Sequence, residues 1–481
     1  MKKRLFIAVE NRYVARWVAD MLKDFSSGNE VEINLLITKQ QKTGSRVLDR
    51  FLPPKLRKIF SKVDITGLFP VVSGDNSSPF LGMVSHQLRK LIPDTGNFPS
   101  KRLFLEKGNK ISAGGYEGAW FFLWHFLALS SPLVIKDEDA NCSYHAFFQV
   151  GSYSFEKNSG FLRFNIEKLL NQLIFAGSHG LPKAKSSDIQ RGKLLKILKY
   201  PFWKFFQKYR ERFLAPRWRL ITMDIEALNE MKRINSKVIS PPVGLEWADP
   251  MLADSNEGLF LFVEEEVNDK GHISVVRLNR ETLSFTEAPQ KIIEKPTHLS
   301  YPFVFRVGSD WYMIPESSEE RKMTIYKSLQ FPLVWVPVRN VFENEQWVDT
   351  TPFFHDGKWW IFSVKKRVDY ASSYQDLFLF YSNDIINGEW HSHPKNPVVS
   401  DVRHARPAGA VFSYRGKLFR PAQNCLHKYG GSLMLCEIIR LTDDDYEEQI
   451  CGEFLFPWYS KLSSFHTIAV CNDRLMGDCY Y

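Results

Sequence analysis

The sequence lacks the cysteine spacings that mark disulfide-rich and zinc-binding proteins. Its six cysteines form no CxxC pair, and none of their spacings matches a zinc site: Cys142, Cys425, Cys436, Cys451, Cys471 and Cys479. A disulfide framework or a cysteine-ligated metal would need such spacings. We therefore expect a reduced chain with no metal site and no bound cofactor.

Long hydrophobic runs are also scarce. The N-terminus, "MKKRLFIAVENRY", has an apolar run that stops at Glu10, which is too short for a signal peptide and predicts a buried first strand. Only residues 118–135, "GAWFFLWHFLALSSPLVI", approach the length of a membrane span, and they include His125 and Pro132. A buried core segment is the preferred interpretation and a spanning helix the alternative. The expected location is cytoplasmic.

The net charge of +9 is concentrated in one segment. Residues 183–219 hold twelve Lys or Arg against Asp188 and Glu211, and the stretch Lys196–Arg219 interleaves these cations with aliphatic and aromatic side chains. One interpretation is peripheral contact with an anionic inner membrane face. The other, equally supported, is an interdomain helix with a solvated basic face. Nucleic acid is not an expected partner, because no recognition motif accompanies the charge.

The chain is too long for one ordinary core, and its two halves follow different patterns. In residues 1–180, "RLFIAV" and "EINLLIT" have strand patterns, and "YVARWVADMLKDF" between them has helical spacing. This βαβ opening predicts a Rossmann-like α/β domain. Residues 181–217 are expected to form a basic aromatic linker or helix, and residues 218–481 an all-β domain.

A repeat runs through the second half. Its unit is a short strand, a polar turn with Gly in most copies, and a second strand, and the copies begin at Asp249, Tyr301, Thr351, Ala408 and His466. These starts lie 52, 50, 57 and 58 residues apart, the length of a four-stranded propeller blade. The repeat therefore predicts a five-bladed β-propeller.

The last copy lacks the outer strand that follows each of the other four, such as "ISVVRLN" and "MTIYKS". The segment "WRLITMDI", just before the first copy, has the missing pattern. We expect it to pair with the strand around Leu475, because such closure removes exposed sheet edges.

Polar residues recur where the inner strands of the blades begin. If these strand ends converge on a central channel, one funnel collects Trp247, Asp249, Tyr301, Asp349, His404, Arg406 and His466, with Glu316, Arg420 and Gln423 from the second strands. Arg406 and Arg420 each precede Pro, fourteen residues apart, and an even separation favours the same face. The alternative is that the aspartates cap turns and the arginines tie the blades together.

Six motifs, in order, carry a family resemblance: "EWADPML", "HLSYPFVF", "WYMIPES", "EWHSHPKNPV", "ARPAGAVF" and "LFRPAQNCLHKYGGSL". Together they resemble the N-terminal propeller domain of the plant glucosamine inositolphosphorylceramide transferases and their bacterial relatives, over residues 218–481. More distantly, "WADP" resembles the first-blade motif of five-bladed glycoside hydrolases such as arabinanases and invertases. "GGYEGAWFF" in the first half faintly resembles a formyltransferase segment, but the N-x-H-x-S motif is absent, so no formyl transfer is expected.

The resemblance implies a carbohydrate-active protein of bacterial type in glycolipid or surface-polysaccharide biosynthesis. Glycosyl transfer or hydrolysis would use Asp249 as base or nucleophile, Glu316 as general acid and Asp349 as an orienting carboxylate. The remaining funnel residues would bind substrate, with Arg406 and Arg420 holding an anionic part of it. Expected partners are a carbohydrate, a sugar phosphate or a lipid-linked sugar. The alternative is a non-catalytic glycan-binding module with an α/β scaffold domain.

Overall fold

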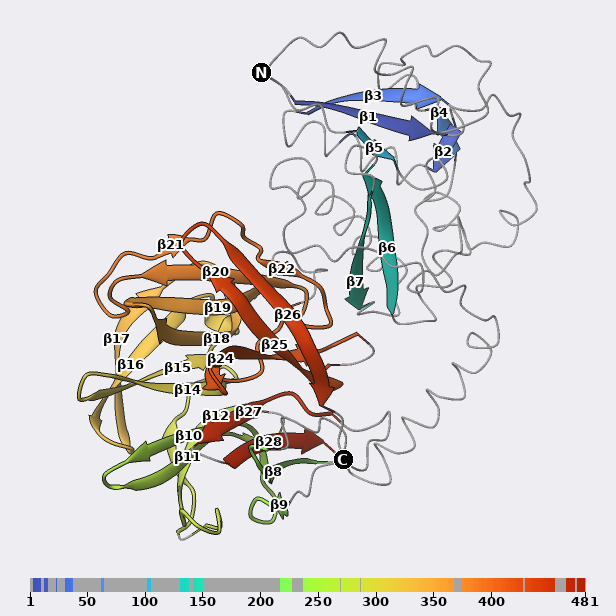
Figure 1. The fold of residues 1–481 in the computed structure, drawn as a ribbon. Helices are drawn as coiled ribbons and strands as arrows, with labels where there is room; N and C mark the ends of the chain where they lie inside the picture. Colours follow the sequence, from blue (N-terminus) through green and yellow to red (C-terminus); the bar gives the residue numbers. More distant parts are fainter. Residues whose placement is uncertain are drawn as a thin grey trace, which may run out of the picture. The chain divides into compact units, whose positions relative to one another are not determined.

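A computed structural model divides the chain into two compact units, residues 1–200 and 201–481, each with its own sheets (Figure 1). In the first unit the structure describes residues 3–9, 13–15, 23, 31–37, 62–64, 102–104, 130–137 and 142–149. In the second it describes residues 217–226, 237–268, 270–285, 287–366, 373–426, 429–454, 464–471 and 474–480.

Five of the described strands of the first unit form a mixed sheet in the order β3-β1-β5-β6-β7. β1 (Lys3–Val9) pairs in parallel with β3 (Val31–Ile37) and β5 (Arg102–Phe104), and the two strands expected from the sequence are therefore present. β6 (Ser130–Asp137) and β7 (Cys142–Gln149) continue the sheet as an antiparallel hairpin. The Rossmann-like fold itself stays a prediction.

One local expectation for this unit is wrong at its start. The segment "YVARWVADMLKDF", predicted as a helix, begins instead with β2 (Tyr13–Ala15), which pairs antiparallel with β4 (Lys62–Asp64). Lys23, near the end of the segment, is helical, and residues 16–22 lie outside the described residues. Tyr and Val favour strands, and a pairing partner decides the outcome over helical spacing. The segments "GGYEGAWFF" and 181–216 lie outside the described residues, and within those described no helix is long and apolar enough to cross a membrane.

The second unit is a five-bladed β-propeller, as predicted. The first blade consists of β10 (Glu246–Ser255), β11 (Gly258–Val267), β12 (Lys270–Leu278) and β13 (Gln290–Ile293). The second consists of β14 (Ser300–Val307), β15 (Asp310–Glu316), β16 (Met323–Gln330) and β17 (Val334–Val341). The third consists of β18 (Gln346–His355), β19 (Lys358–Lys366), β20 (Asp376–Ser382) and β21 (His391–Ser392), with β22 (Val399–Ser400) also paired to β20.

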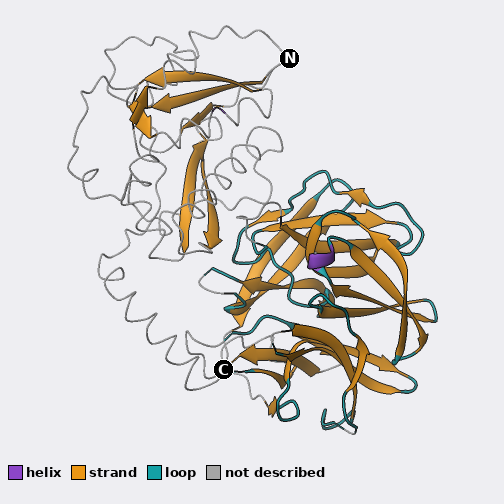
Figure 2. Cartoon of the chain, turned by 180° about the vertical axis from the view of Figure 1, so that it is seen from behind, coloured by secondary structure: helices purple, strands orange, loops and turns teal. Residues whose placement is uncertain are grey.

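The fourth blade consists of β23 (Phe412–Tyr414), β24 (Lys417–Asn424), β25 (Ser432–Leu441) and β26 (Tyr446–Phe454). The fifth consists of β27 (Ile468–Cys471), β28 (Arg474–Tyr480), β8 (Trp218–Asp224) and β9 (Lys237–Ile239). Strands and loops make up this unit, with one 3-10 turn, Ser318–Glu320, among the residues that the structure describes (Figure 2).

Large apolar side chains fill the spaces between neighbouring blades. Phe262 of the first blade and Met313 of the second, for example, are fully buried in one shared cluster. Each such side chain stabilises the fold by about 1.5–3 kcal/mol relative to exposure. This packing holds the inner strands in place at the centre of the ring.

The fifth blade is closed by the chain segment that precedes the first blade. β28 pairs antiparallel with β8, with Leu475 opposite Met223, and Figure 1 shows the red strands β27 and β28 beside the green strand β8. The predicted closure by "WRLITMDI" is therefore confirmed. Leu220 of β8 is fully buried and packs with Trp247 of the first blade and Met476 of β28.

We expect Leu220→Ala to destabilise the full-length chain by about 2–5 kcal/mol, because it leaves a cavity where β8 joins the fifth and first blades. Urea unfolding followed by tryptophan fluorescence measures this change. Asp224→Ala on the same strand is the control, since that side chain is mostly exposed and pairs with Arg474 at the surface. Equal midpoints for the two variants would contradict the role of β8 in closure.

Candidate functional site

The inner strand of each of the first three blades contains a β-bulge at the same position. The strand register shifts between Ala248 and Met251, and the corresponding shifts in β14 and β18 surround Tyr301 and Asp349. Asp249, Tyr301 and Asp349 have φ values of 51°, 44° and 48°. Such left-handed backbone costs about 1–3 kcal/mol at a non-glycine residue and concentrates at functional sites.

The backbone N–H of each bulged residue is bonded to a carboxylate of the preceding blade. Asp249 N donates to Asp478 Oδ2 of the fifth blade at 2.9 Å, and Tyr301 N donates to Asp249 Oδ2 at 3.1 Å. Asp349 N donates to Glu316 Oε2 at 3.3 Å. These hydrogen bonds link four blades in sequence around the centre, and we call them the inter-blade chain.

Asp249 lies in a buried group with residues of the fifth blade. Its Oδ1 accepts a hydrogen bond from Thr467 Oγ1 at 2.5 Å, and His466 Nδ1 lies 2.6 Å from Asp478 Oδ2 and 3.8 Å from Asp249 Oδ1. Burial raises the pKa of Asp249 to about 8, although His466 opposes this shift. Burial also disfavours the His466 cation, but Asp478 and Asp249 outweigh it and raise the pKa of His466 to about 9.

A second group joins the second, third and fourth blades. The Arg406 guanidinium donates to both oxygens of Asp349, from Nε at 2.5 Å and from Nη2 at 3.1 Å, and its Nη2 lies 3.8 Å from Glu316 Oε2. Gln423 Nε2 donates to Asp349 Oδ2 at 2.8 Å. Burial raises the pKa of Glu316 well above its usual range, Asp349 adds to the shift, and Arg406 opposes it.

Aromatic rings flank these two groups. The Arg406 guanidinium lies 5.2 Å from the ring centre of Tyr374 and 4.9 Å from that of Tyr429. The Tyr429 ring meets His466 edge-on at 5.1 Å, and His466 stacks on Trp218 at 4.2 Å. Tyr374, Tyr429 and Trp218 are partly exposed.

Seven of the ten residues predicted from sequence therefore lie in one connected network. We call this set the mouth: Asp249, Tyr301, Glu316, Asp349, Arg406, Gln423 and His466. Tyr301 joins it because its hydroxyl bonds to Thr351 Oγ1 at 2.8 Å and accepts the Gly409 N–H at 2.9 Å.

The other three predicted residues, Trp247, His404 and Arg420, lie elsewhere. Trp247 is fully buried in the cluster between the fifth and first blades, where its Nε1 donates to Glu265. Arg420 is 0% exposed, and it donates to both oxygens of Glu448 and to the backbone oxygen of His404.

The error concerning Arg420 has a geometric cause. Gln423 and Arg420 both lie on β24, and side chains an odd number of positions apart point to opposite faces of a strand. Gln423 reaches Asp349 in the mouth, so Arg420 faces the packed interior between the third and fourth blades, over the Phe362 ring. The even separation of Arg406 and Arg420 does not decide the matter, because Arg406 precedes β23 and is not part of a regular ladder.

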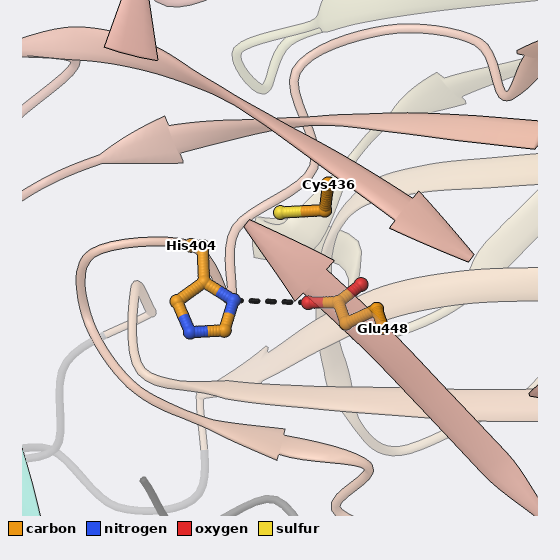
Figure 3. A group of neighbouring side chains, drawn as sticks. All are labelled: His404, Cys436 and Glu448. Atoms are coloured by element: carbon orange, nitrogen blue, oxygen red, sulfur yellow. Dashed lines mark hydrogen bonds and ion pairs between the residues drawn. The ribbon is translucent and has the colours of Figure 1, made fainter. Parts of the chain in front are cut away.

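The group around Arg420 contains possible metal ligands. Figure 3 shows His404, Cys436 and Glu448 close together, with His404 Nδ1 2.9 Å from Glu448 Oε1. The ligand atoms of these three residues lie within 4.8 Å of one another. However, Arg420 donates to both Glu448 oxygens at 2.7 and 2.8 Å. The guanidinium supplies the positive charge here, so the geometry describes a buried ion-pair group.

Sequence reasoning missed three residues around the mouth: Glu264, His298 and Asp478. Glu264 lies opposite Ala248 in β11, as Glu316 lies opposite Ser300 in β15. Aligning the second strands of the repeat copies would have identified Glu264 once Glu316 was chosen. His298 Nε2 lies 2.9 Å from Glu264 Oε1, and no repeat signal marks it.

The comparisons with known proteins concern the propeller. Residues 241–455 match the family model of the N-terminal region of glucosamine inositolphosphorylceramide transferase 1. The rice (japonica) protein of that name is 32% identical over 205 residues, which are 42% of this chain and 27% of the rice protein. The Arabidopsis thaliana protein is 31% identical over 42% of this chain and 26% of its own length. The chain thus spans about a quarter of these relatives, and these plant proteins give no support to the expected bacterial type or to the formyltransferase-like half.

Two solved structures have weaker similarity. A family 117 glycoside hydrolase of Zobellia galactanivorans aligns over 55% of this chain and 90% of its own, with a TM-score of 0.35 and 10% identity. An α-L-arabinofuranosidase of Podospora anserina aligns over 50% and 92%, with a TM-score of 0.35 and 10% identity.

We expect Arg420→Gln to lose about 3–5 kcal/mol of stability, because it leaves the buried Glu448 carboxylate without its charged partner. Lys417→Gln on the same strand is the matched control, since its ion pair with Glu437 is exposed to solvent and screened by it. Thermal unfolding of both full-length variants measures the difference. If Arg420→Gln melts with the control, the ion-pair group is not structural.

We expect the stability of the chain to fall between pH 6.5 and about 9. The folded-state pKa of His466 is raised to about 9, so its stabilising contribution is complete below the unfolded value near 6.5 and is lost as the pH rises through 9. Ionisation of buried Asp249, whose pKa is about 8, acts in the same direction. The stability that His466 contributes below pH 6.5 and loses by pH 9 is about 3 kcal/mol. Urea midpoints across this range measure it, and His466→Gln should flatten the curve while His355→Gln, at a partly exposed histidine, leaves it unchanged. An identical slope in His466→Gln would refute the assignment.

Proposed function

We propose that the mouth binds and processes the carbohydrate of a glycoconjugate or a lipid-linked sugar, in glycolipid or surface-polysaccharide biosynthesis. The observation that carries this proposal is the convergence of carboxyl, amide, guanidinium and imidazole groups from all five blades beside partly exposed aromatic rings. Aromatic faces pack against the apolar face of a sugar ring, and fixed polar groups select its orientation.

The sequence comparison supports the same class of ligand. Six of the seven mouth residues lie within the matched stretch 241–455, the exception being His466. The relatives that match this stretch are named glucosamine inositolphosphorylceramide transferases. A sugar attached to a phospholipid-like carrier is therefore the first substrate class to test.

The mouth has features of a glycosyl-transfer or hydrolysis site. Glu316 and Asp349 both approach Nη2 of Arg406, at 3.8 and 3.1 Å, so their carboxyl groups are close enough to serve one sugar ring. The raised pKa of Glu316 suits a general acid, which must hold its proton at neutral pH. Asp249 can act as a base only when ionised, and its pKa of about 8 favours weakly alkaline conditions.

A second function, non-catalytic glycan binding, is favoured by a different observation. Asp249 is 4% exposed and Asp349 is 2% exposed, and every carboxylate oxygen of both accepts a hydrogen bond from the protein. A catalytic carboxylate must reach the reacting atoms. In this arrangement both side chains act first as supports of the inter-blade chain and of Arg406.

We expect the full-length chain to bind glycans on an array containing neutral, amino and uronic-acid sugars, and Tyr429→Ala to bind the same glycans about tenfold more weakly. The loss of one sugar-stacking ring accounts for about 1.4 kcal/mol. Tyr429→Phe retains the ring and should retain most of the affinity. Phe354→Ala removes an exposed aromatic ring at a hairpin outside the mouth and is the control.

Turnover separates the two functions. The wild-type chain and Glu316→Gln are incubated with inositolphosphorylceramide vesicles, with nucleotide sugars and with the glycans bound on the array, and the products are followed by mass spectrometry. A product formed by the wild type and lost in Glu316→Gln supports catalysis. Binding without any product supports the binding module, and neither binding nor product would refute the proposed function.

A further inference from the structure

Glu264 occupies in the first blade the position that Glu316 occupies in the second. Each lies on the second strand, directly opposite the residue that precedes the bulged one in β10 or β14. Burial raises the pKa of Asp249 and of Tyr429, and the negative charge of Glu264 contributes to both shifts. It is therefore within electrostatic reach of both groups and belongs on the mouth side of β11.

The oxygens of the other carboxylates in and beside the mouth accept hydrogen bonds from donors of the protein. Asp249 and Asp349 accept on both oxygens, as described above. The two oxygens of Glu316 accept from Ser318 Oγ at 3.0 Å and from Asp349 N at 3.3 Å. Asp478 accepts on Oδ1 from the backbone N–H of His466 and on Oδ2 from that of Asp249. Every oxygen of these four carboxylates therefore accepts at least one hydrogen bond.

Glu264 differs in this respect. Its side chain is 9% exposed, and Oε1 lies 2.9 Å from His298 Nε2. Among the residues that the structure describes, no donor bonds to its Oε2. This oxygen is not fully enclosed and keeps some exposed surface. A carboxylate oxygen that is nearly buried and lacks a donor is costly unless a ligand or water supplies one.

His298 holds Glu264 in one orientation. The backbone N–H of Gly271 donates to His298 Nδ1 at 3.0 Å, which makes Nδ1 the acceptor and leaves the proton on Nε2, 2.9 Å from Glu264 Oε1. The site also requires a glycine at position 271. A Cβ there would lie 2.8 Å from Glu264 Oε1 and 2.8 Å from His298 Cε1. His298 itself is 38% exposed, more than any of the mouth carboxylates.

We propose that Glu264 Oε2 is the carboxylate oxygen that contacts the sugar, accepting a hydrogen bond from a hydroxyl or ammonium group, and that His298 is its positioning residue. This inference rests on the proposed function and deepens it. It assigns a sugar contact to the first blade, in addition to the roles proposed above for Asp249, Glu316 and Asp349. The interaction is a hydrogen bond to a charged acceptor, which is stronger than one between neutral groups.

The test compares Glu264→Gln with Glu265→Gln in the full-length chain. Glu265 is the adjacent residue on the opposite face of β11, where it binds Trp247, His272 and Ser274 away from the mouth. The probes are the disaccharide glucosaminyl-β-1,4-glucosamine and cellobiose, which have a similar backbone and differ at C2, and binding is measured by NMR titration. Glu264→Gln should bind at least tenfold more weakly, while Glu265→Gln should lose stability and retain affinity in its folded fraction.

The two probes distinguish the donor groups. A larger loss of affinity for the amino disaccharide identifies an ammonium contact, and equal losses identify a hydroxyl. If the wild type binds either probe and Glu264→Gln binds it equally well, the assignment of Glu264 is overturned while the proposed function stands. If the wild type binds neither disaccharide, contact between Glu264 and a sugar of this kind is also overturned, and the glycan array decides the proposed function separately.

The positioning role of His298 has its own test. His298→Leu removes the imidazole that faces Glu264 Oε1, so Glu264 loses its fixed orientation and the folded fraction should bind the disaccharide more weakly. His298→Gln can restore a polar contact and should recover part of the affinity. A role limited to stability would lower the melting temperature of His298→Leu without changing the affinity of the folded fraction, and that result would overturn the assignment.

Discussion

The hydrogen bond from a bulged inner strand to the carboxylate of the preceding blade is the interaction on which the centre of this propeller depends. Asp249, Tyr301 and Asp349 each have left-handed backbone, which is unfavourable on its own. The N–H that each bulge frees from the ladder is satisfied by Asp478, Asp249 or Glu316. Strain in one blade is thus offset by a hydrogen bond to an acidic side chain of its neighbour, and the blades specify one another's geometry.

This arrangement couples architecture with chemistry. A carboxylate that accepts two or three protein donors is rigid and well placed, but it has little capacity left for a ligand. Asp349 illustrates this, because Arg406 and Gln423 together occupy both of its oxygens. Glu264 has one oxygen left over. The distribution of donors, rather than the number of acidic residues, separates supporting carboxylates from those that can contact a substrate.

Repeat spacing predicted the five blades and the closing strand, because each blade must bury the same apolar faces and the pattern therefore recurs. It also predicted most of the mouth, since Asp249, Tyr301, Asp349, Arg406 and His466 each lie at the start of a repeat copy or two residues before it. Trp247 and Arg420 were misplaced because a bulge or an irregular inner strand changes which face a side chain occupies. His298 lies in a connection between blades, where no periodic signal exists, so only the folded chain reveals it.

The pairing of β8 with β28 also sets the order in which the chain can complete its fold. Asp224 and Arg474, which meet across this pair, lie 250 residues apart in sequence. During synthesis β8 leaves the ribosome early and must wait, unpaired, until β28 has been translated. The first four blades can form before then, but the ring cannot close. Long-range closure of this kind slows folding and leaves an apolar edge exposed to other chains, so the nascent protein has reason to depend on a chaperone.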